Sequence, residues 1–134
     1  KVILIVDDNS FNLLVAQKSL EDYGFSTFMA YNGKEAIEVV QQLHSESISP
    51  SLILMDLEMP VMDGIEATKV LIKKMQDKEV AEIPIVGLSA NDSEIIMKSC
   101  LDAVMSKYCR KPLMDKDLLD LLKEYGLISE ESNS

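Results

Sequence analysis

The stretch Leu52-Ile53-Leu54-Met55-Asp56-Leu57-Glu58-Met59-Pro60 contains an apolar run of strand length that ends in an acid. A continuous apolar run is typical of a strand buried on both faces, as the central strands of parallel sheets are. Pro60 and Gly64 follow Asp56 closely and predict a loop there. We therefore expect Asp56 at the carboxyl end of an inner strand, where open α/β sheets bind their ligands. A lone acid in this place more often caps the next helix, so a functional role requires that other acids converge on Asp56.

The composition is that of one globular domain without a membrane span. The chain has 134 residues, of which 47% are hydrophobic, and no apolar run approaches the roughly 18 residues that a span needs. Its 13 basic and 23 acidic residues give a net charge of −10, which argues against direct nucleic-acid binding. Cys100 and Cys109 lack metal-site spacing and are expected to be reduced, small hydrophobic side chains. We expect a cytoplasmic domain that is a monomer in isolation and makes no direct membrane contact.

Strand and helix signals alternate along the whole chain. Strands are expected at 2–6, 25–30, 52–56, 83–88 and 103–109, and helices at 10–23, 32–44, 63–75, 92–101 and 115–125. Such alternation indicates a parallel sheet with helices on both faces. Five strands suit the flavodoxin-like order 2-1-3-4-5, which makes the fold class α/β and the architecture (βα)5. The domain is expected over residues 1–126, followed by a flexible polar tail over 127–134.

In that strand order the carboxyl ends of four neighbouring strands bring polar groups to one edge of the sheet. These groups are Asp7 with Asp8, Asp56, Ser89 and Lys111. Three carboxylates at one edge repel one another unless a cation offsets them, and Mg²⁺ is the usual cation where phosphate is also bound. A hydroxyl and an ammonium complete the groups needed to hold a phosphoryl group, and an Asp carboxylate is a competent nucleophile for its transfer. Without a P-loop, the chain is not expected to bind ATP as the phosphoryl donor.

These motifs resemble those of the receiver domain of two-component response regulators, over residues 2–125. The resemblance is strongest to receivers attached to hybrid histidine kinases. It is carried by Val-Asp-Asp-Asn at 6–9 with Asn12, by Asn-Gly-Lys-Glu-Ala at 32–36, and by Met-Asp-Leu-Glu-Met-Pro-Val-Met-Asp-Gly at 55–64. Together with the missing initiator Met and the polar tail, it favours an excised domain of a hybrid sensor kinase over a free-standing regulator. The parent protein would then carry this domain on the cytosolic side of a membrane-bound sensor.

The resemblance implies a role for each residue of the site. Asp56 would accept a phosphoryl group from a phosphohistidine of a histidine kinase or a histidine-phosphotransfer protein, with Mg²⁺ or, as a substitute, Mn²⁺. Asp8 would bind the metal directly and Asp7 largely through water. The remaining implied roles are metal binding by Asp56 and the backbone carbonyl of Glu58, phosphoryl binding or switching by Ser89, Ala90, Lys111 and Tyr108, and a cis peptide bond before Pro112. The aspartyl phosphate would change the domain surface or pass its phosphoryl group to a histidine-phosphotransfer protein.

Three positions depart from the family pattern. Ser89 replaces the commoner Thr, which keeps the hydroxyl but loses a methyl group. Val104 stands where the family often has Gly, and a β-branched residue resists positive φ at a cost of ~1 kcal/mol or more. Glu58 adds a fourth acid beside the site and is placed, like Asn91, where it can alter the lifetime of the phosphate. None of these departures removes a required group.

Two residues have competing interpretations. Tyr108 fits equally well as the family's aromatic switch and as a half-buried strand tyrosine. Phe11, with Val15, Pro112 and Leu113, is a candidate contact for a histidine-phosphotransfer protein that docks helix on helix beside the site. The alternative for Phe11, a core or hydrophobic-staple residue, is slightly favoured by the sequence alone.

Two other functions compete with the phosphoacceptor hypothesis. A degenerate receiver would serve only as a docking module, but Asp7, Asp8, Asp56, Ser89 and Lys111 are all present. A Mg²⁺-dependent phosphatase with an aspartyl nucleophile would need an Asp-x-Asp motif, usually after the first strand. The third strand instead ends in Asp56-Leu57-Glu58, which makes the phosphatase the weaker alternative.

Overall fold

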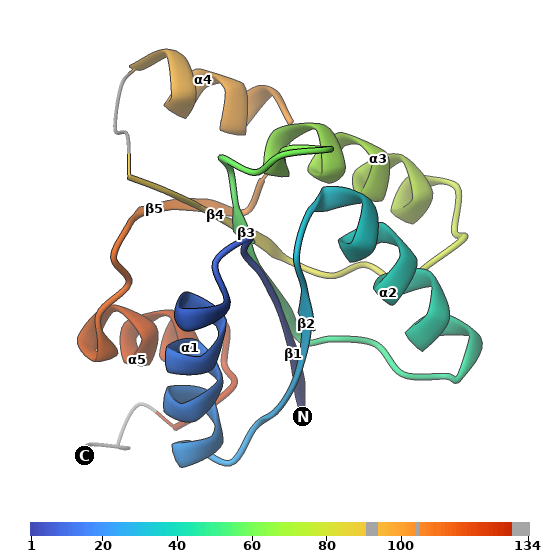
Figure 1. Cartoon of the computed structure of the whole chain (residues 1–134). Coiled ribbons are helices and arrows are strands. Elements are labelled where there is room, and N and C mark those ends of the chain that lie inside the picture. The colour runs from blue at the N-terminus through green and yellow to red at the C-terminus, as the bar shows by residue number, and fades with distance from the viewer. Residues whose placement is uncertain (91–93, 104, 130–134) are drawn as a thin grey trace.

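Five short strands form one parallel sheet in the computed structural model, which describes residues 1–90, 94–103 and 105–129. The strands are β1 (Val2–Val6), β2 (Ser26–Ala30), β3 (Leu52–Asp56), β4 (Ile85–Ser89) and β5 (Lys107–Arg110). Their order is β2-β1-β3-β4-β5, which confirms the predicted topology (Figure 1). Of the three inner strands, β3 and β4 are buried over their full length and β1 over all but its first residue, as their continuous apolar sequences predict.

Helices cover both faces of this sheet. They are α1 (Ser10–Asp22), α2 (Gly33–Ser45), α3 (Gly64–Gln76), α4 (Glu94–Asp102) and α5 (Asp115–Glu124). Figure 1 shows α1 and α5 on one face and α2, α3 and α4 towards the other. The side chains of Asn9, Asn32 and Asp63 accept a backbone N–H three residues later, at 3.1, 2.9 and 2.8 Å, and so begin α1, α2 and α3. None of the helices in the described residues is long and apolar enough to cross a membrane.

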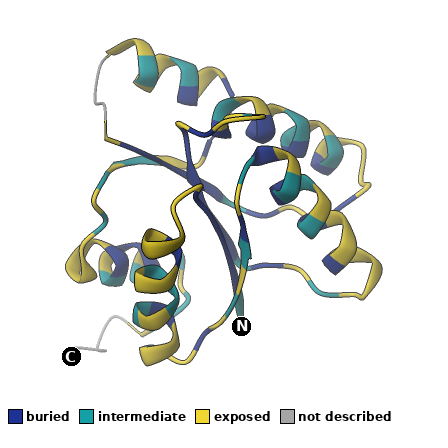
Figure 2. Ribbon diagram, in the orientation of Figure 1, coloured by how far each residue is buried: buried dark blue, intermediate teal, exposed yellow. Residues whose placement is uncertain are grey.

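Alternate residues of β3 supply two separate apolar cores. Ile53 and Met55 pack into the core beneath α2, α3 and α4, while Leu52 and Leu54 pack into the core beneath α1 and α5. This alternation follows from the two-residue period of a strand. Buried residues accordingly follow the sheet and the inner helix faces in Figure 2, whereas the outer helix faces are exposed. The double burial of β3 fixes the position of the acid at its end.

The fourth and fifth strands begin later than predicted. β4 starts at Ile85 rather than 83, because Pro84 has no N–H to donate and contributes only its carbonyl to Ile53, at 3.0 Å. β5 starts at Lys107 rather than 103. Before it, the N–H of Ala103 donates to the carbonyl of Ser99 at 3.0 Å and the N–H of Met105 to the carbonyl of Cys100 at 3.1 Å, so both residues bond back to α4 rather than to β4. The break that the sequence predicted at Arg110 is also wrong, because Arg110 is the last residue of β5 and pairs with Ser89.

Two smaller differences concern packing. Leu14, an apolar residue of α1, is 58% exposed rather than buried, because the buried stripe of that helix passes through Leu13 and Leu20. At the start of the expected tail, Leu127 and Ile128 pack against the core beneath α1 and α5. Residues 130–134 of that tail lie outside the described residues, as do Asn91 and Val104.

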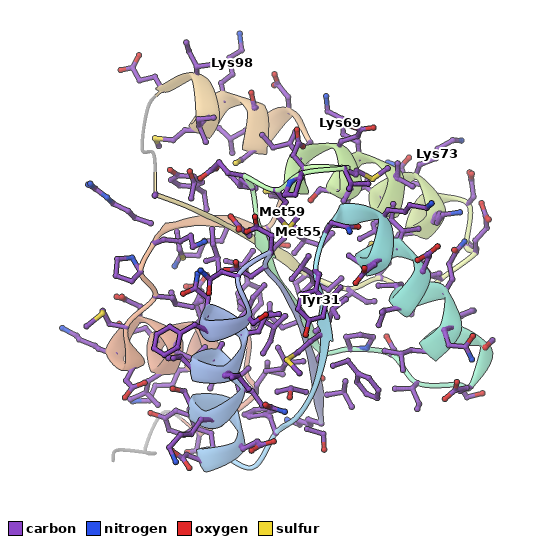
Figure 3. All side chains as sticks on the ribbon, viewed as in Figure 1. Tyr31, Met55, Met59, Lys69, Lys73 and Lys98 are labelled. Carbon is purple, nitrogen blue, oxygen red and sulfur yellow. The ribbon has the colours of Figure 1, made fainter. Side chains whose placement is uncertain are left out.

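Gly64 offers a stability test of the loop that follows Asp56. A Cβ at this position would lie against the carbonyl oxygen of Asp56 and 2.9 Å from Cγ of Met55, both parts of the buried sheet. We expect Gly64→Ala to lower the free energy of unfolding by about 1–3 kcal/mol in urea titrations, because neither group can yield easily. Lys69→Ala, on the exposed face of the same helix (Figure 3), should change the free energy of unfolding by less than about 0.5 kcal/mol. Equal stability of the two variants would contradict this packing.

Candidate functional site

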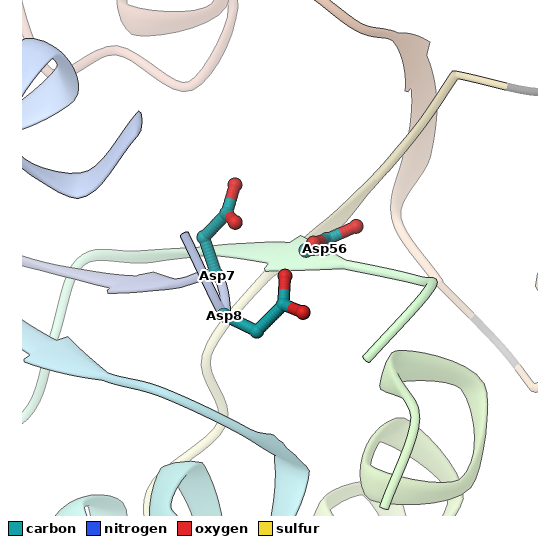
Figure 4. A group of neighbouring side chains, drawn as sticks. All are labelled: Asp7, Asp8 and Asp56. Carbon is teal, nitrogen blue, oxygen red and sulfur yellow. The ribbon is translucent and has the colours of Figure 1, made fainter. Parts of the chain in front are cut away.

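Three carboxylates meet at the carboxyl edge of the sheet. Asp7 and Asp8 follow β1, and Asp56 ends β3, the neighbouring strand. One carboxylate oxygen from each lies within 4.8 Å of the other two, and Figure 4 shows the three side chains around one point. Asp7 and Asp56 are only 5% and 2% exposed, whereas Asp8 is exposed to solvent. The structure thus brings together the three acids that the strand order predicted.

The turn between β1 and α1 orients the Asp7 carboxylate. Its Oδ1 accepts the backbone N–H of Asn9 at 2.9 Å, and its Oδ2 accepts the side-chain amide of Asn12 at 3.3 Å. Asn9 also caps α1, so the same few residues begin the helix and fix the acid. Asn9 and Asn12, which the sequence analysis gave only as part of a motif, thus both hold the Asp7 carboxylate in place.

Lys111 links the outer strand β5 to the two buried acids. Its Nζ lies 3.2 Å from Oδ2 of Asp7 and 3.3 Å from Oδ2 of Asp56. The backbone N–H of Lys111 donates to the carbonyl of Ser89 at 2.8 Å, and the peptide bond to Pro112 is cis. Burial opposes the charged ammonium, but the Asp56 and Asp7 carboxylates together outweigh it and raise the pKa of Lys111. Lys111 therefore carries a firmly held positive charge between the two acids.

One ammonium does not neutralise this site. Burial raises the pKa of Asp56 to about 6, against the attraction of Lys111 and with the added repulsion of Asp7. The N–H of Glu58, 3.2 Å from Oδ1 of Asp56, acts in the opposite direction. A cluster of oxygen ligands with uncompensated negative charge has the chemistry of a site for a hard divalent cation such as Mg²⁺.

Ser89 and Glu58 form a contact that the sequence did not predict. Ser89 ends β4 and is fully buried, and its hydroxyl donates to Oε2 of Glu58 at 2.8 Å. The backbone N–H of Ala90 points to the other oxygen of the same carboxylate, Oε1, at 3.4 Å. Spacing could not reveal the contact, because the two side chains are 31 positions apart and meet only through the pairing of β3 with β4. Among the described residues, the Glu58 carboxylate is not part of the acidic cluster formed by Asp7, Asp8 and Asp56.

Tyr108 lies on β5 one strand away from these groups. It is half-buried, pairs in register with Gly87 of β4 and packs against the core beneath α2, α3 and α4. The position is compatible with both interpretations of Tyr108, as a switch and as a structural residue. Both therefore remain hypotheses.

A surface cavity of about 460 Å³ lies beside the acidic cluster, between α1 and the segment that follows β5. Phe11 and Val15 of α1, which are 72% and 49% exposed, line it, as do Lys111, Pro112 and Leu113. The slightly favoured prediction that Phe11 is a core or staple residue is therefore wrong. Its place on the first turn of α1 directs it away from the stripe of Leu13 and Leu20, which packs on the sheet.

Comparisons with known proteins show similarity over most of the chain. Residues 3–123 match the family described as the response regulator receiver domain. The chain is 37% identical over 122 residues to hybrid signal transduction histidine kinase M of Dictyostelium discoideum, covering 91% of this chain and 5% of that protein. It is 36% identical over 126 residues to the sensor protein GacS of Pseudomonas syringae pv. syringae, covering 93% and 13% of the two chains. The chain thus spans only a small part of these curated relatives.

Solved structures of receiver domains are similar to this fold over most of its length. The receiver domain of the histidine kinase CKI1 from Arabidopsis thaliana, complexed with Mg²⁺, superposes with a TM-score of 0.81 at 30% sequence identity, over 92% of this chain and 90% of that one. The same receiver domain complexed with Mg²⁺ and BeF3⁻ superposes with a TM-score of 0.82 at 29% identity, over 96% and 91% of the two chains. These similarities extend over nearly the whole of the fold that carries the acidic cluster.

The pKa of Asp56 predicts how the stability of the metal-free domain depends on pH. The folded state, with a pKa of about 6, holds this proton more tightly than an unfolded chain with the ordinary value of 3.8. The stabilising contribution of the protonated carboxyl is therefore present at low pH and is lost as the pH rises through 6. In EDTA, the unfolding free energy of the wild type relative to Asp56→Asn should fall by about 2 kcal/mol between about pH 4.5 and pH 7. A difference that does not change with pH in urea titrations would contradict the raised pKa.

Proposed function

The chain belongs to the response regulator receiver family, and from that premise we propose that it is a phosphoacceptor domain of a phosphorelay. Asp56 would take a phosphoryl group from a phosphohistidine. The observation that carries this proposal is the Lys111 ammonium, which contacts both buried acids within a cluster of three carboxylates. Such a site combines a nucleophilic carboxylate with a fixed positive charge, which together can bind and stabilise a transferring phosphoryl group.

The acidic cluster has the ligands that Mg²⁺ requires. Asp8 and Asp56 would bind the ion through carboxylate oxygens, Asp7 largely through water, and Glu58 through its backbone carbonyl, with Mn²⁺ as a substitute. When bound, the ion offsets the negative charge of the carboxylates and of the phosphoryl oxygens. The Mg²⁺ complex of the similar CKI1 receiver supports this assignment.

Each residue around Asp56 has its own role in the proposed phosphoryl transfer. A carboxylate oxygen of Asp56 would form the new P–O bond as the P–N bond of the phosphohistidine breaks and the histidine leaves. Lys111, already 3.3 Å from Oδ2 of Asp56, would bind the oxygens of the incoming group. The Ser89 hydroxyl and the Ala90 N–H, on the adjacent strand end, would donate hydrogen bonds to it. Tyr108 on β5 would transmit the rearrangement to the surface around α4, β5 and α5.

The partner that this site needs is a protein carrying a phosphohistidine, either a histidine kinase or a histidine-phosphotransfer protein. The cavity beside the acidic cluster offers exposed apolar groups, Phe11 and Val15, at the entrance to Asp56. A helix that presents its histidine could pack against them while the imidazole reaches the carboxylate. The curated relatives are hybrid kinases and sensor proteins, which supports a parent protein of that type in the cytoplasm or on the cytosolic side of a membrane.

The first test of this function is a mass measurement. With Mg²⁺ and acetyl phosphate or phosphoramidate, the intact domain should gain one phosphoryl group, and the gain should disappear with EDTA and in Asp56→Asn and Asp56→Ala. No gain with either donor, in protein that binds Mg²⁺, would favour a docking module without phosphoacceptor activity. Steady turnover of the donor without a lasting adduct would fit both a fast-hydrolysing receiver and the phosphatase alternative, and a rapid-quench time course would then separate the two.

The second test concerns the docking surface. The donor in this test is a phosphohistidine protein that labels the wild type. Phe11→Ala and Val15→Ala should each make phosphoryl transfer from it about tenfold slower, because exposed apolar anchors beside a site contribute most of the docking energy. Labelling by acetyl phosphate should stay unchanged, because that donor needs no docking surface. Leu14→Ala is the matched control, since Leu14 is 58% exposed on the same helix but does not line the cavity. Equal transfer rates for Phe11→Ala and Leu14→Ala would place the partner elsewhere.

A further inference from the structure

The side chain of Glu58 occupies two hydrogen-bond donors that the proposed function assigns to the phosphoryl group. Its Oε2 accepts the Ser89 hydroxyl at 2.8 Å, and its Oε1 lies 3.4 Å from the N–H of Ala90. From this geometry we infer that the Glu58 carboxylate is an internal competitor of the phosphoryl group and must leave Ser89 and Ala90 before the phosphorylated state can form. The inference rests on the proposed function and adds a regulatory residue to it.

A carboxylate is well suited to compete for these donors. Like a phosphoryl group, it carries negative charge and presents two oxygens side by side, so it can accept from a hydroxyl and a neighbouring backbone N–H together. Hydrogen bonds to a charged acceptor are stronger than those between neutral groups. The two ligands cannot use Ser89 and Ala90 at once, and their like charges repel each other beside Asp56. Occupation by Glu58 therefore lowers the apparent affinity of the site for a phosphoryl group.

The backbone holds Glu58 in this position. The N–H of Leu57 donates to the carbonyl of Leu88 at 2.9 Å, which continues the pairing of β3 with β4 beyond the strand end. The N–H of Glu58 donates to Oδ1 of Asp56 at 3.2 Å. With the segment fixed at both points, the side chain of Glu58 reaches Ser89 at the end of β4.

The structure also provides a place for the displaced side chain. Glu58 lines a second surface cavity of about 430 Å³, between the segment that follows β3 and helix α4. Leu57, Met59, Pro60 and Ile96 form other parts of its wall. The cavity is open to solvent, so the carboxylate can turn into it and become hydrated when it leaves Ser89. Both positions of Glu58 are thus accessible, and their balance sets how readily the site accepts a phosphoryl group.

The competition can be measured with beryllium trifluoride, an anion that resembles a phosphoryl group but forms no covalent bond. Titrations of the full chain with BeF3⁻ at saturating Mg²⁺, followed by amide NMR, should show about tenfold tighter binding for Glu58→Ala than for the wild type. Glu58→Asp should also bind more tightly, because a side chain shorter by one methylene cannot keep both contacts although it retains the charge. The backbone carbonyl of Glu58, assigned to the metal, is present in every variant. Glu38→Gln, which removes an exposed charge on α2, should bind as the wild type does.

The amide resonance of Ala90 provides a second readout, without metal or anion. It should shift in Glu58→Ala and Glu58→Asp but not in Glu38→Gln, because only the first two lose the acceptor at 3.4 Å. Unchanged or weaker BeF3⁻ binding in Glu58→Ala would overturn the inference while leaving the proposed function intact. Tighter binding in Glu58→Ala but not in Glu58→Asp would also overturn it, by showing that charge alone acts. If the wild type itself does not bind BeF3⁻, the proposed function fails and the competitive role of Glu58 fails with it.

Discussion

The burial of a carboxylate at the end of β3 is the constraint on which the rest of this structure depends. Asp56 is 2% exposed and continues a strand that is packed on both faces, so neither it nor the strand can move towards water. A charge in this position requires partners. The fold supplies Lys111 from beyond β5, two strands away, and the N–H of Glu58 from the loop after β3. The order of the strands therefore decides which side chains meet at the site.

Lys111 offsets only part of the negative charge of the carboxylates, and the remaining charge suits the site to its proposed chemistry. Lys111 is shared between Asp56 and Asp7, while Asp8 adds a third carboxylate nearby. A fully neutralised cluster would have little affinity for a cation, and a solvent-exposed one would hold its ligands too loosely. Here the pKa of Asp56 rises to about 6, mainly because burial disfavours its charge. The stability lost by ionising Asp56 can be recovered when a cation binds, which couples folding energy to ligand affinity.

Two surface cavities lie on either side of the acidic site. On one side, the cavity lined by Phe11 and Val15 leads from solvent to the acidic cluster and has the character of a docking surface. On the other side, Glu58 holds Ser89 and also lines the cavity towards α4. A partner would thus approach from α1 and the segment after β5, whereas Glu58 acts from the segment after β3.

The sequence by itself determined the (βα)5 order and the three acids at strand ends, because periodicity and strand ends are local properties. The cis peptide bond before Pro112 was expected only from the family resemblance. The sequence could not determine where β4 and β5 begin. Pro84 offers only its carbonyl to Ile53, and Met105 bonds back to Cys100 of α4 instead of pairing with β4. Nor could the sequence place Phe11 in solvent or Glu58 on Ser89. Those outcomes depend on which way a side chain points and on which distant group it meets. Only the packed sheet decided them, because it brings together residues that are far apart in the chain.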